Sequence, residues 1–253
     1  MENNMLPPVN STLSVKQLYE QSPLGDRLAH FENPTTVWLG EALAEVWYQF
    51  QKQLAAVNIV QKMESGSVTL DDYKLYLLNL RQQVKDGARW ITRAASSMDD
   101  QHLLLRSALI KHAGQEHQDF LMLEKNYVSV GGDIGDIQRY PQNVGSEALS
   151  SYIMYQASQP NPANLFGATF VIEGLGTKKA SKWATSLKEC LGLTTEQVSF
   201  LHYHGENDDD HYENLIKVLS SPLITPEVAP RLVKTAKVVG RLYALQLEEL
   251  GNI

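Results

Sequence analysis

Apolar residues recur along the chain at spacings of three and four, the pattern typical of amphipathic helices. Proline is absent from three long stretches, residues 35–140, 163–221 and 231–253. Because proline in a helix interior costs about 3 kcal/mol, each stretch is free to form helices. Alternating runs of Val, Ile and Thr, which indicate strands, are nearly absent. The pattern therefore predicts an all-α fold.

Capping residues divide these stretches into about seven helices. Thr194 with Gln197 three residues later forms a capping box, and Asp71 and Asp72 place negative charge at the positive end of a helix dipole. The expected helices start at or near Pro34, Thr69, Asp99 or Asp100, Ser146, Asn161, Thr194 and Thr225. We expect a single-domain helical bundle over residues 35–253, preceded by an irregular segment over residues 1–34.

Charge and cysteine content narrow the class of partner. The net charge is −7, from 22 Lys and Arg against 29 Asp and Glu, which argues against a nucleic-acid-binding protein. Cys190 is the only cysteine, so the chain has neither an internal disulfide nor a CxxC metal site. The first residues lack the basic and apolar regions of a secretory signal, and the apolar runs are too short to cross a bilayer. These features predict a soluble cytoplasmic protein, either a monomer or a homodimer, that binds a small molecule and neither nucleic acid nor membrane.

Titratable side chains interrupt the apolar face of the third expected helix. At about 100° per residue, positions spaced by three and four share one face of a helix. The stripe reads Leu105, Leu109, His112, Glu116, Asp119 and Leu123. The middle three side chains are therefore expected to point into the bundle.

The penultimate helix has the same kind of stripe, and one further carboxylate joins it. That stripe reads Leu201, His204, Asp208, His211 and Leu215. Glu173 follows Phe166 and Phe170 on another apolar helix. A buried carboxylate must be protonated, paired with a cation or bound to metal. Each stripe alone is also compatible with a hydrogen-bonded polar layer, but three together favour a metal site between facing helices.

The ligand types indicate the metal. Carboxylates and imidazoles without thiolates suit iron or manganese, and zinc is also compatible. Three histidines and four carboxylates suit two ions, whose open coordination positions could bind dioxygen. The candidate ligands are His112, Glu116, Asp119, Glu173, His204, Asp208 and His211. No catalytic residue beyond these ligands is singled out.

Glu173 in the sequence FVIEGLG, followed by His204-x3-Asp208-x2-His211, resembles the heme-oxygenase-like diiron oxidases. The resemblance implies a heme-oxygenase-like bundle, two ferrous ions and dioxygen as co-substrate. The chain departs from the family pattern on the earlier helix, where the family histidine falls on Asp119 and the family glutamates fall on His112 or Glu116. Some members take a further carboxylate from the preceding helix, where Asp86 is the nearest candidate. Heme ligation is not expected, because the only early histidine, His30, precedes the first helix.

The family's reactions include fatty-acid decarboxylation, N-oxygenation, cleavage of amino-acid side chains and nitrile formation from a tryptophan-derived amino acid. We expect cleavage of a C–N or C–C bond in a small amino acid, aromatic or tryptophan-like, with a nitrile as one candidate product. The aromatic pocket candidates are Trp47, Trp90, Tyr152 and Phe170. The alternatives are a fatty-acid decarboxylase or N-oxygenase of the same family, a metal-free binding protein, and a zinc or manganese hydrolase. The thiaminase-like branch needs a cysteine nucleophile, and nothing around Cys190 in the sequence would activate it.

The two halves of the expected site differ in how closely they follow the family. His204, Asp208 and His211 match it without substitution, whereas the helix carrying Asp119 does not. We therefore expect the ion held by the penultimate helix and Glu173 to bind more tightly than the other.

Overall fold

The computed structural model describes residues 6–253, except for the side chains at positions 26, 28 and 207–211. These residues form helices and no strands, which confirms the all-α prediction. The α-helices are α1 (Val15–Gln21), α2 (Pro34–Ala55), α3 (Asn58–Ser65), α4 (Leu70–Ser96), α5 (Leu103–Glu116), α6 (Phe120–Ser129), α7 (Ile134–Arg139), α8 (Val144–Ala157), α9 (Phe166–Leu175), α10 (Ser181–Leu191), α11 (Ser199–Leu219) and α12 (Val228–Glu248). No helix among the described residues combines the length and hydrophobicity needed to cross a membrane.

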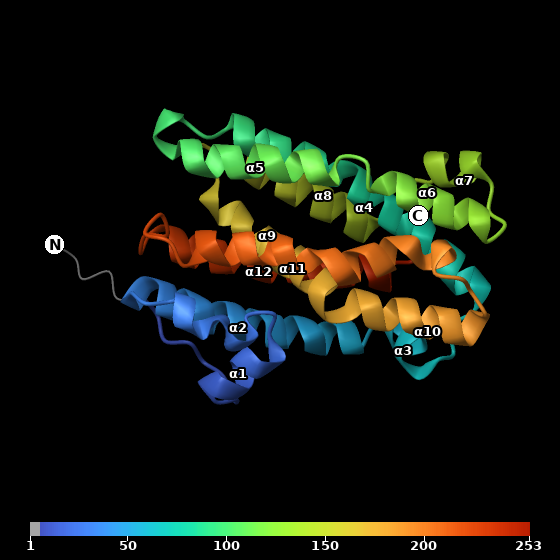
Figure 1. Cartoon of the computed structure of the whole chain (residues 1–253), viewed down its shortest axis with the longest axis horizontal. Helices are drawn as coiled ribbons and strands as arrows, with labels where there is room; N and C mark the ends of the chain where they lie inside the picture. Colours follow the sequence, from blue (N-terminus) through green and yellow to red (C-terminus); the bar gives the residue numbers. More distant parts are fainter. Residues whose placement is uncertain (1–5) are drawn as a thin grey trace.

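The long helices lie roughly along the longest axis of the molecule (Figure 1). In the view of Figure 1, α5 and α6 form the upper edge, α9, α11 and α12 run through the middle, and α1 and α2 lie below them. Contacts of α12 with α2, α8 and α9 tie the layers together, and α4 packs against α5, α6 and α8. The middle layer is thus enclosed between segments that are distant in sequence.

Helix starts that depend on local capping follow the predictions. The Asn33 side chain accepts a hydrogen bond from the Thr36 amide, with Pro34 in the first turn of α2. Thr69 and Asp72 form a reciprocal capping box at the start of α4. Gln197 and Thr194 exchange the same pair of bonds before α11. Each cap satisfies amide groups that the first helical turn leaves without a partner.

The described residues form more helices than the seven expected. The first expected helix is divided into α2 and α3 at Val57, and the third is divided into α5 and α6 at residues 117–119. Within the N-terminal segment expected to be irregular, α1 forms behind a capping box of Ser14 and Gln17. The expected helix after Asn161 consists of a short 3₁₀ turn, α9, a π-helical segment (Gly176–Ala180) and α10.

A buried ion pair joins α4 to α6 inside the apolar interior. The guanidinium of Arg81 donates two hydrogen bonds to Oε1 of Glu124, at 3.0 and 2.6 Å, and Gln138 donates to Oε2 at 3.2 Å. Both charged side chains are buried, and the Arg81 guanidinium also lies over the Phe120 ring. This pair ties α6 to α4, five residues after the predicted ligand Asp119.

Candidate metal centre

Two candidate ligands lie where α5 gives way to α6, and a third, His112, lies one turn earlier on α5. Glu116 is the last residue of α5, and Asp119 immediately precedes α6. Across the junction, the Asp119 amide donates to the Glu116 carbonyl at 3.3 Å, and the Met122 amide donates to the Asp119 carbonyl at 3.0 Å. Such bonds to the third preceding residue wind the chain more tightly than an α-helix, which changes the residues that share a face. Asp119 is therefore directed at a different partner from His112 and Glu116.

His112, Glu116 and Glu173 form one cluster of potential ligands. His112 Nε2 lies 3.3 Å from Glu173 Oε1 and 3.7 Å from Glu116 Oε1. One ligand atom from each of the three side chains lies within 4.8 Å of the other two. The Glu173 side chain is buried, and the other two are half-buried. Two carboxylates and one imidazole thus converge from α5 and α9.

Asp119 and His204 form a second, neighbouring pair. His204 Nε2 on α11 lies 3.4 Å from Asp119 Oδ2, and both side chains are buried. The Phe200 ring, one turn earlier on α11, packs against the His204 imidazole with 4.3 Å between ring centroids. That packing holds the imidazole on the side of the helix that faces Asp119.

The pairing across the site differs from the expected halves. Sequence analysis grouped Glu173 with the ligands of α11 and Asp119 with those of α5, whereas Glu173 pairs with His112 and Asp119 pairs with His204. The tight winding between α5 and α6 turns Asp119 toward α11, although its charge still acts on Glu116. Asp208 and His211 belong to α11, and their side chains lie outside the described part of the structure.

The two neighbouring carboxylates perturb each other. Burial, and then the negative charge of Glu173, raise the pKa of Glu116 from 4.5 to about 7, against the opposing influence of His112 and His204. A carboxyl group that is costly to ionise in the metal-free protein becomes a good ligand once a cation compensates its charge. The electrostatics therefore favour a cation at this position.

A π-helical segment follows Glu173 and brings α11 close to α9. The Thr177 hydroxyl donates to the Glu173 carbonyl at 3.1 Å, within the wider turn that begins at Gly176. This segment packs against α11, where Gly205 leaves room for Ser181: a Cβ atom on Gly205 would overlap Ser181 Oγ and lie 2.6 Å from its backbone nitrogen. Isolated π turns are rare and occur often at functional sites. Here the turn sets the approach of His204 to the Glu173 helix.

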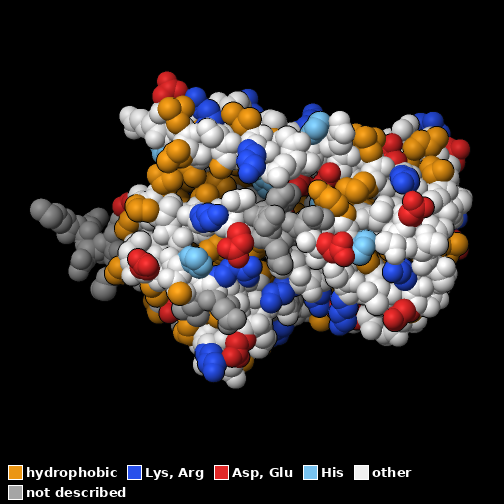
Figure 2. Space-filling model, in the orientation of Figure 1, with side chains coloured by type: hydrophobic (Ala, Val, Ile, Leu, Met, Phe, Trp, Pro, Cys, Tyr) orange, Lys and Arg blue, Asp and Glu red, His pale blue; other side chains and the backbone are white. Residues whose placement is uncertain are grey.

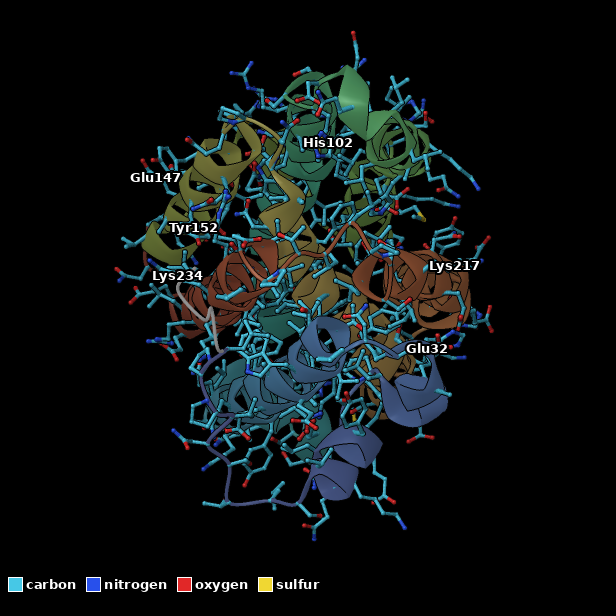
Figure 3. The ribbon with its side chains drawn as sticks, turned by 90° about the vertical axis from the view of Figure 1, so that its left-hand side faces the viewer. Glu32, His102, Glu147, Tyr152, Lys217 and Lys234 are labelled. Carbon is cyan, nitrogen blue, oxygen red and sulfur yellow. The ribbon has the colours of Figure 1, made fainter. Side chains whose placement is uncertain are left out.

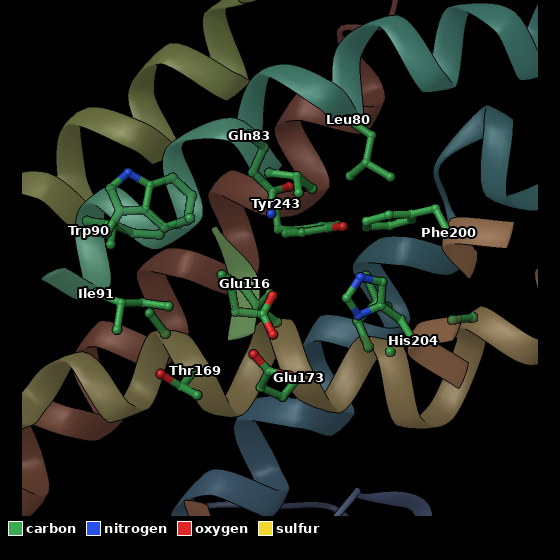
Figure 4. A pocket seen from close by; sticks show the side chains of 18 of the residues that line it. Leu80, Gln83, Trp90, Ile91, Glu116, Thr169, Glu173, Phe200, His204 and Tyr243 are labelled. Atoms are coloured by element: carbon green, nitrogen blue, oxygen red, sulfur yellow. The ribbon is translucent and has the colours of Figure 1, made fainter. Parts of the chain in front are cut away.

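An apolar cavity opens directly from the ligand cluster (Figure 4). It spans about 950 Å³, including its open mouth, and its walls come from α4, α5, α8, α9, α10, α11 and α12. His112, Glu116, Glu173 and His204 form one polar region of the lining, and most other lining side chains are aliphatic or aromatic. No Lys or Arg lines the cavity among the described residues.

The expected aromatic pocket residues separate into two groups. Trp90 lines the cavity, on the opposite side from His204 in Figure 4. Trp47 and Phe170 are fully buried and pack edge-to-face in the core with 6.2 Å between centroids, away from the lining. Tyr152 is half-buried at the outer side of α8 (Figure 3). Asp86 accepts hydrogen bonds from Arg89, Gln142 and Ser150 instead of joining the cluster.

Several lining residues were missed by sequence analysis, although a signal for one of them exists. The missed side chains include Tyr76, Gln83, Trp183, Phe200 and Tyr243. Residues 76, 80, 83, 87 and 90 form a stripe on α4 with spacings of four and three, and Gln83 is the polar interruption in it. Like the ligand stripes, this stripe places a polar side chain on an apolar helix face, and the spacing alone therefore predicts that Gln83 points inward.

A second cavity reaches the same cluster from between α5 and α11. It spans about 780 Å³, again including open space, and its lining includes Leu109, Phe166 and Leu215, with Lys111 and Lys217. Figure 2 shows hydrophobic side chains in the furrow between α5 and α11 on this face, and Figure 3 places Lys217 at its outer edge. His112 and Thr169 line both cavities, so the ligand cluster can be approached from two sides.

The described donors fit an iron site. Imidazole nitrogens and carboxylate oxygens are ligands that iron accepts, and three carboxylates beside two imidazoles would compensate the charge of a divalent ion. His112, Glu116 and Glu173 are already close enough to bind one ion together. Asp119 and His204 offer two further ligands beside them.

Comparison with solved structures supports the fold. The chain is similar to a domain of unknown function with a heme oxygenase-like fold from Shewanella denitrificans, at 20% identity over 82% of this chain and 89% of that one, with a TM-score of 0.76. It is also similar to a TenA homologue from Pseudomonas syringae (13% identity, 88% and 98% coverage, TM-score 0.71) and to one from P. horikoshii (15%, 84% and 97%, 0.69). The heme-oxygenase-like bundle is thereby confirmed. No curated protein sequence matches the chain.

The decisive comparison is with protein families. The profile of a family described as iron-containing redox enzymes matches residues 97–244. That range holds α5 to α11 and most of α12, and with them every residue of the ligand cluster. The chain belongs to the family of iron-containing redox enzymes.

Proposed function

We propose that the protein is a dioxygen-dependent, dinuclear non-heme iron oxidase or oxygenase. Its substrate would be a small amino acid with an apolar, aromatic or tryptophan-like body, and the reaction would cleave a C–N or C–C bond, with a nitrile as one candidate product. The proposed iron ligands are His112, Glu116, Asp119, Glu173, His204, Asp208 and His211.

One observation carries the proposal. Two carboxylates and two imidazoles from α5, α9 and α11 line one region of a largely apolar cavity, and a third carboxylate, Asp119 at the α5–α6 junction, pairs with one of these imidazoles. A buried hydrogen-bonded layer would explain a single carboxylate, whereas two carboxylates beside the same imidazole favour a bound cation, which would offset their repulsion. Membership of an iron-containing redox family supplies the identity of that cation.

Bound iron would supply redox chemistry with dioxygen at the coordination positions that the protein leaves open. The chain's own side chains prepare the site for it. His112 and His204 would bind through Nε2 as neutral imidazoles, and Glu116 would release the proton that its raised pKa retains in the metal-free protein. The walls formed by Leu80, Ile172 and Trp183 exclude water and hold an apolar substrate body beside the ligands.

The thiaminase-like alternative is not supported by the position of the cysteine. Cys190 is exposed near the end of α10, with its Sγ 3.8 Å from the Ser186 hydroxyl, and it does not line either cavity at the ligand cluster. A nucleophile for that chemistry has to face the substrate. The cavity instead presents carboxylates and imidazoles.

Anaerobic titration with ferrous iron, followed by metal analysis, tests the proposal. The expected result is up to two irons per chain, and oxygen uptake that is triggered by one member of an amino-acid panel. Binding of fewer than about 0.3 equivalents would contradict it and favour a metal-free binding protein. Turnover that proceeds without oxygen in zinc- or manganese-loaded protein would favour a hydrolase. Oxygen uptake that is triggered by fatty acids instead would identify a decarboxylase of the same family.

A further inference from the structure

The cavity has a second polar region, formed by an uncharged amide and phenols. Gln83 on α4 and Tyr243 on α12 line it on the side opposite Glu173 (Figure 4). The Gln83 side chain is only 4% exposed. A buried amide normally satisfies its hydrogen-bonding groups within the protein, so the surroundings of this one are informative.

A buried network holds Gln83 from behind. Gln246 Nε2 donates to Gln83 Oε1 at 2.7 Å, and the Ser146 hydroxyl donates to Gln246 Oε1 at 3.0 Å. Asn143 Nδ2 donates to the Gln246 carbonyl at 2.9 Å. Gln246, Ser146 and Asn143 are all almost completely buried, so the network lies away from solvent. The network thus occupies the Oε1 atom of Gln83 and leaves its Nε2 group to hydrogen-bond a molecule in the cavity.

Two phenols extend this polar region. Tyr243 and Tyr76 both line the cavity, and burial is the main cause that raises the pKa of each phenol far above 10. Both hydroxyls therefore remain neutral and able to donate a hydrogen bond.

The cavity offers no partner for a charged group away from the ligand cluster. Its described lining contains no Lys or Arg, and its only carboxylates are Glu116 and Glu173 of the cluster. Positions 1–5, 26, 28 and 207–211, whose side chains the structure does not describe, contain neither Lys nor Arg. A second ionised group on a substrate would be desolvated here without compensation.

We infer that Gln83, with Tyr243, is a specificity-determining residue that hydrogen-bonds an uncharged polar group on the apolar body of the substrate. This inference rests on the proposed function in one respect: the proposed function places the ionised end of the substrate at the metal ligands, so that its apolar body extends toward Gln83. The substrate class is then narrowed to molecules that carry a hydroxyl, carbonyl or ring N–H on the apolar body. Hydrocarbon chains without such a group, and bodies with a second charge, are selected against.

Binding of a matched pair of probes tests the inference without turnover. We would titrate 4-ethylphenol and ethylbenzene into the full chain, both metal-free and loaded anaerobically with ferrous iron, and measure heats of binding. Gln83→Leu is expected to lower the affinity for 4-ethylphenol about 5- to 10-fold, because this probe loses a hydrogen bond. The affinity for ethylbenzene, which makes no such bond, should stay the same or increase.

Gln82→Leu is the matched control. It removes the neighbouring buried amide of α4, whose Nε2 donates to the Ile137 carbonyl at 3.0 Å outside the cavity. The affinities for both probes should therefore change by the same small factor. Tyr243→Phe keeps the ring and is expected to weaken 4-ethylphenol selectively, which provides a second measurement should Gln83→Leu fold poorly. An equal effect of the Gln83 and Tyr243 substitutions on both probes would overturn the inference. So would failure of the wild type to bind either probe.

The outcomes separate this inference from the proposed function. Selective weakening in a chain that binds no iron would keep the role of Gln83 and reject the iron enzyme. Stoichiometric iron binding, with the Gln83 substitution affecting both probes equally, would keep the iron enzyme and reject the role of Gln83.

Discussion

His112 Nε2 and Glu173 Oε1 lie 3.3 Å apart, and this contact joins α5 to α9 at the polar region of the cavity. Neither residue is near the other in sequence, so only the packed bundle brings them together. His112 is the central residue of the site. The same nitrogen also lies 3.7 Å from Glu116 Oε1, and the side chain lines both cavities.

Removal of this imidazole should therefore weaken iron binding. We expect His112→Ala to lower the affinity for ferrous iron at least about 10-fold in an anaerobic titration, because it deletes a ligand and leaves two carboxylates in repulsion. The control is His117→Ala, which removes an exposed histidine whose Nδ1 contacts the Gly114 carbonyl at the end of the same helix. Equal iron binding by both variants would argue against His112 as a ligand.

The observed pairing predicts that the two ions can be lost separately. Asp119→Ala removes the carboxylate that faces His204 and leaves His112, Glu116 and Glu173 in place. Iron content after anaerobic loading should fall by about one equivalent per chain and not by two. Asp136→Ala, a change to an exposed carboxylate on α7, should leave iron content unaltered. Complete loss of iron in Asp119→Ala would show that the two positions are not separable.

The raised pKa of Glu116 predicts a pH-dependent stability of the metal-free protein. Below about pH 4.5 the carboxyl is protonated in both the folded and the unfolded chain, so it imposes no penalty on folding. As the pH rises through the folded-state pKa of about 7, the folded chain must ionise this group in its buried position, and the stabilising advantage of the protonated form is lost. Urea unfolding of the metal-free wild type and of Glu116→Gln at about pH 5 and about pH 8 measures the effect. The variant should gain stability relative to wild type at the higher pH, and a pH-independent difference would contradict the assignment.

The buried ion pair of Arg81 and Glu124 should stabilise the fold only while both partners are present. Glu124→Ala leaves the guanidinium buried without its carboxylate and is expected to cost about 3–5 kcal/mol in denaturant unfolding. The double variant Arg81→Met, Glu124→Leu should recover most of that loss, since it buries apolar groups of similar size. If the double variant were as unstable as the single one, lost packing and not an uncompensated charge would be the cause.

The close approach of α11 to the start of α10 predicts opposite effects at two helical glycines. Gly205→Ala would place a Cβ into Ser181, including its backbone, and should destabilise the protein by about 1–3 kcal/mol. Gly114→Ala on α5 meets nothing within 4 Å and should stabilise the protein by about 0.5–1 kcal/mol through helix propensity. Thermal unfolding of both variants gives the comparison, and a neutral Gly205→Ala would show that α11 can move away without cost.

Sequence predicted those parts of the fold that local chemistry decides. The capping box of Thr69 and Asp72 forms within one turn, so its residues suffice to identify it. Asn161 was expected to cap a helix in the same way and does not. Its backbone adopts a left-handed conformation, with φ of 48°, and its side chain exchanges hydrogen bonds with Asp99 from another loop. That partner is set by tertiary packing, which the local pattern does not contain.

The same distinction applies to the site. The stripe through His112 and Glu116 was visible because both lie on one regular helix. The pairing of Asp119 with His204 was not, because it depends on the tighter winding before α6, where no glycine or proline marks a break. Gln83 could not be assigned in the same way, because glutamine carries no charge and its burial does not demand a cation or a metal.

The π-helical segment after Glu173 also affects how relatives of this chain can be found. A π turn accommodates one residue more than an α turn over nearly the same path. A protein without it could hold the same side chains in the same places with one residue fewer between Glu173 and His204. Searches that fix this spacing would miss such a protein, whereas an alignment that permits a single-residue gap within Gly176–Ala180 would keep both ends of the motif in register.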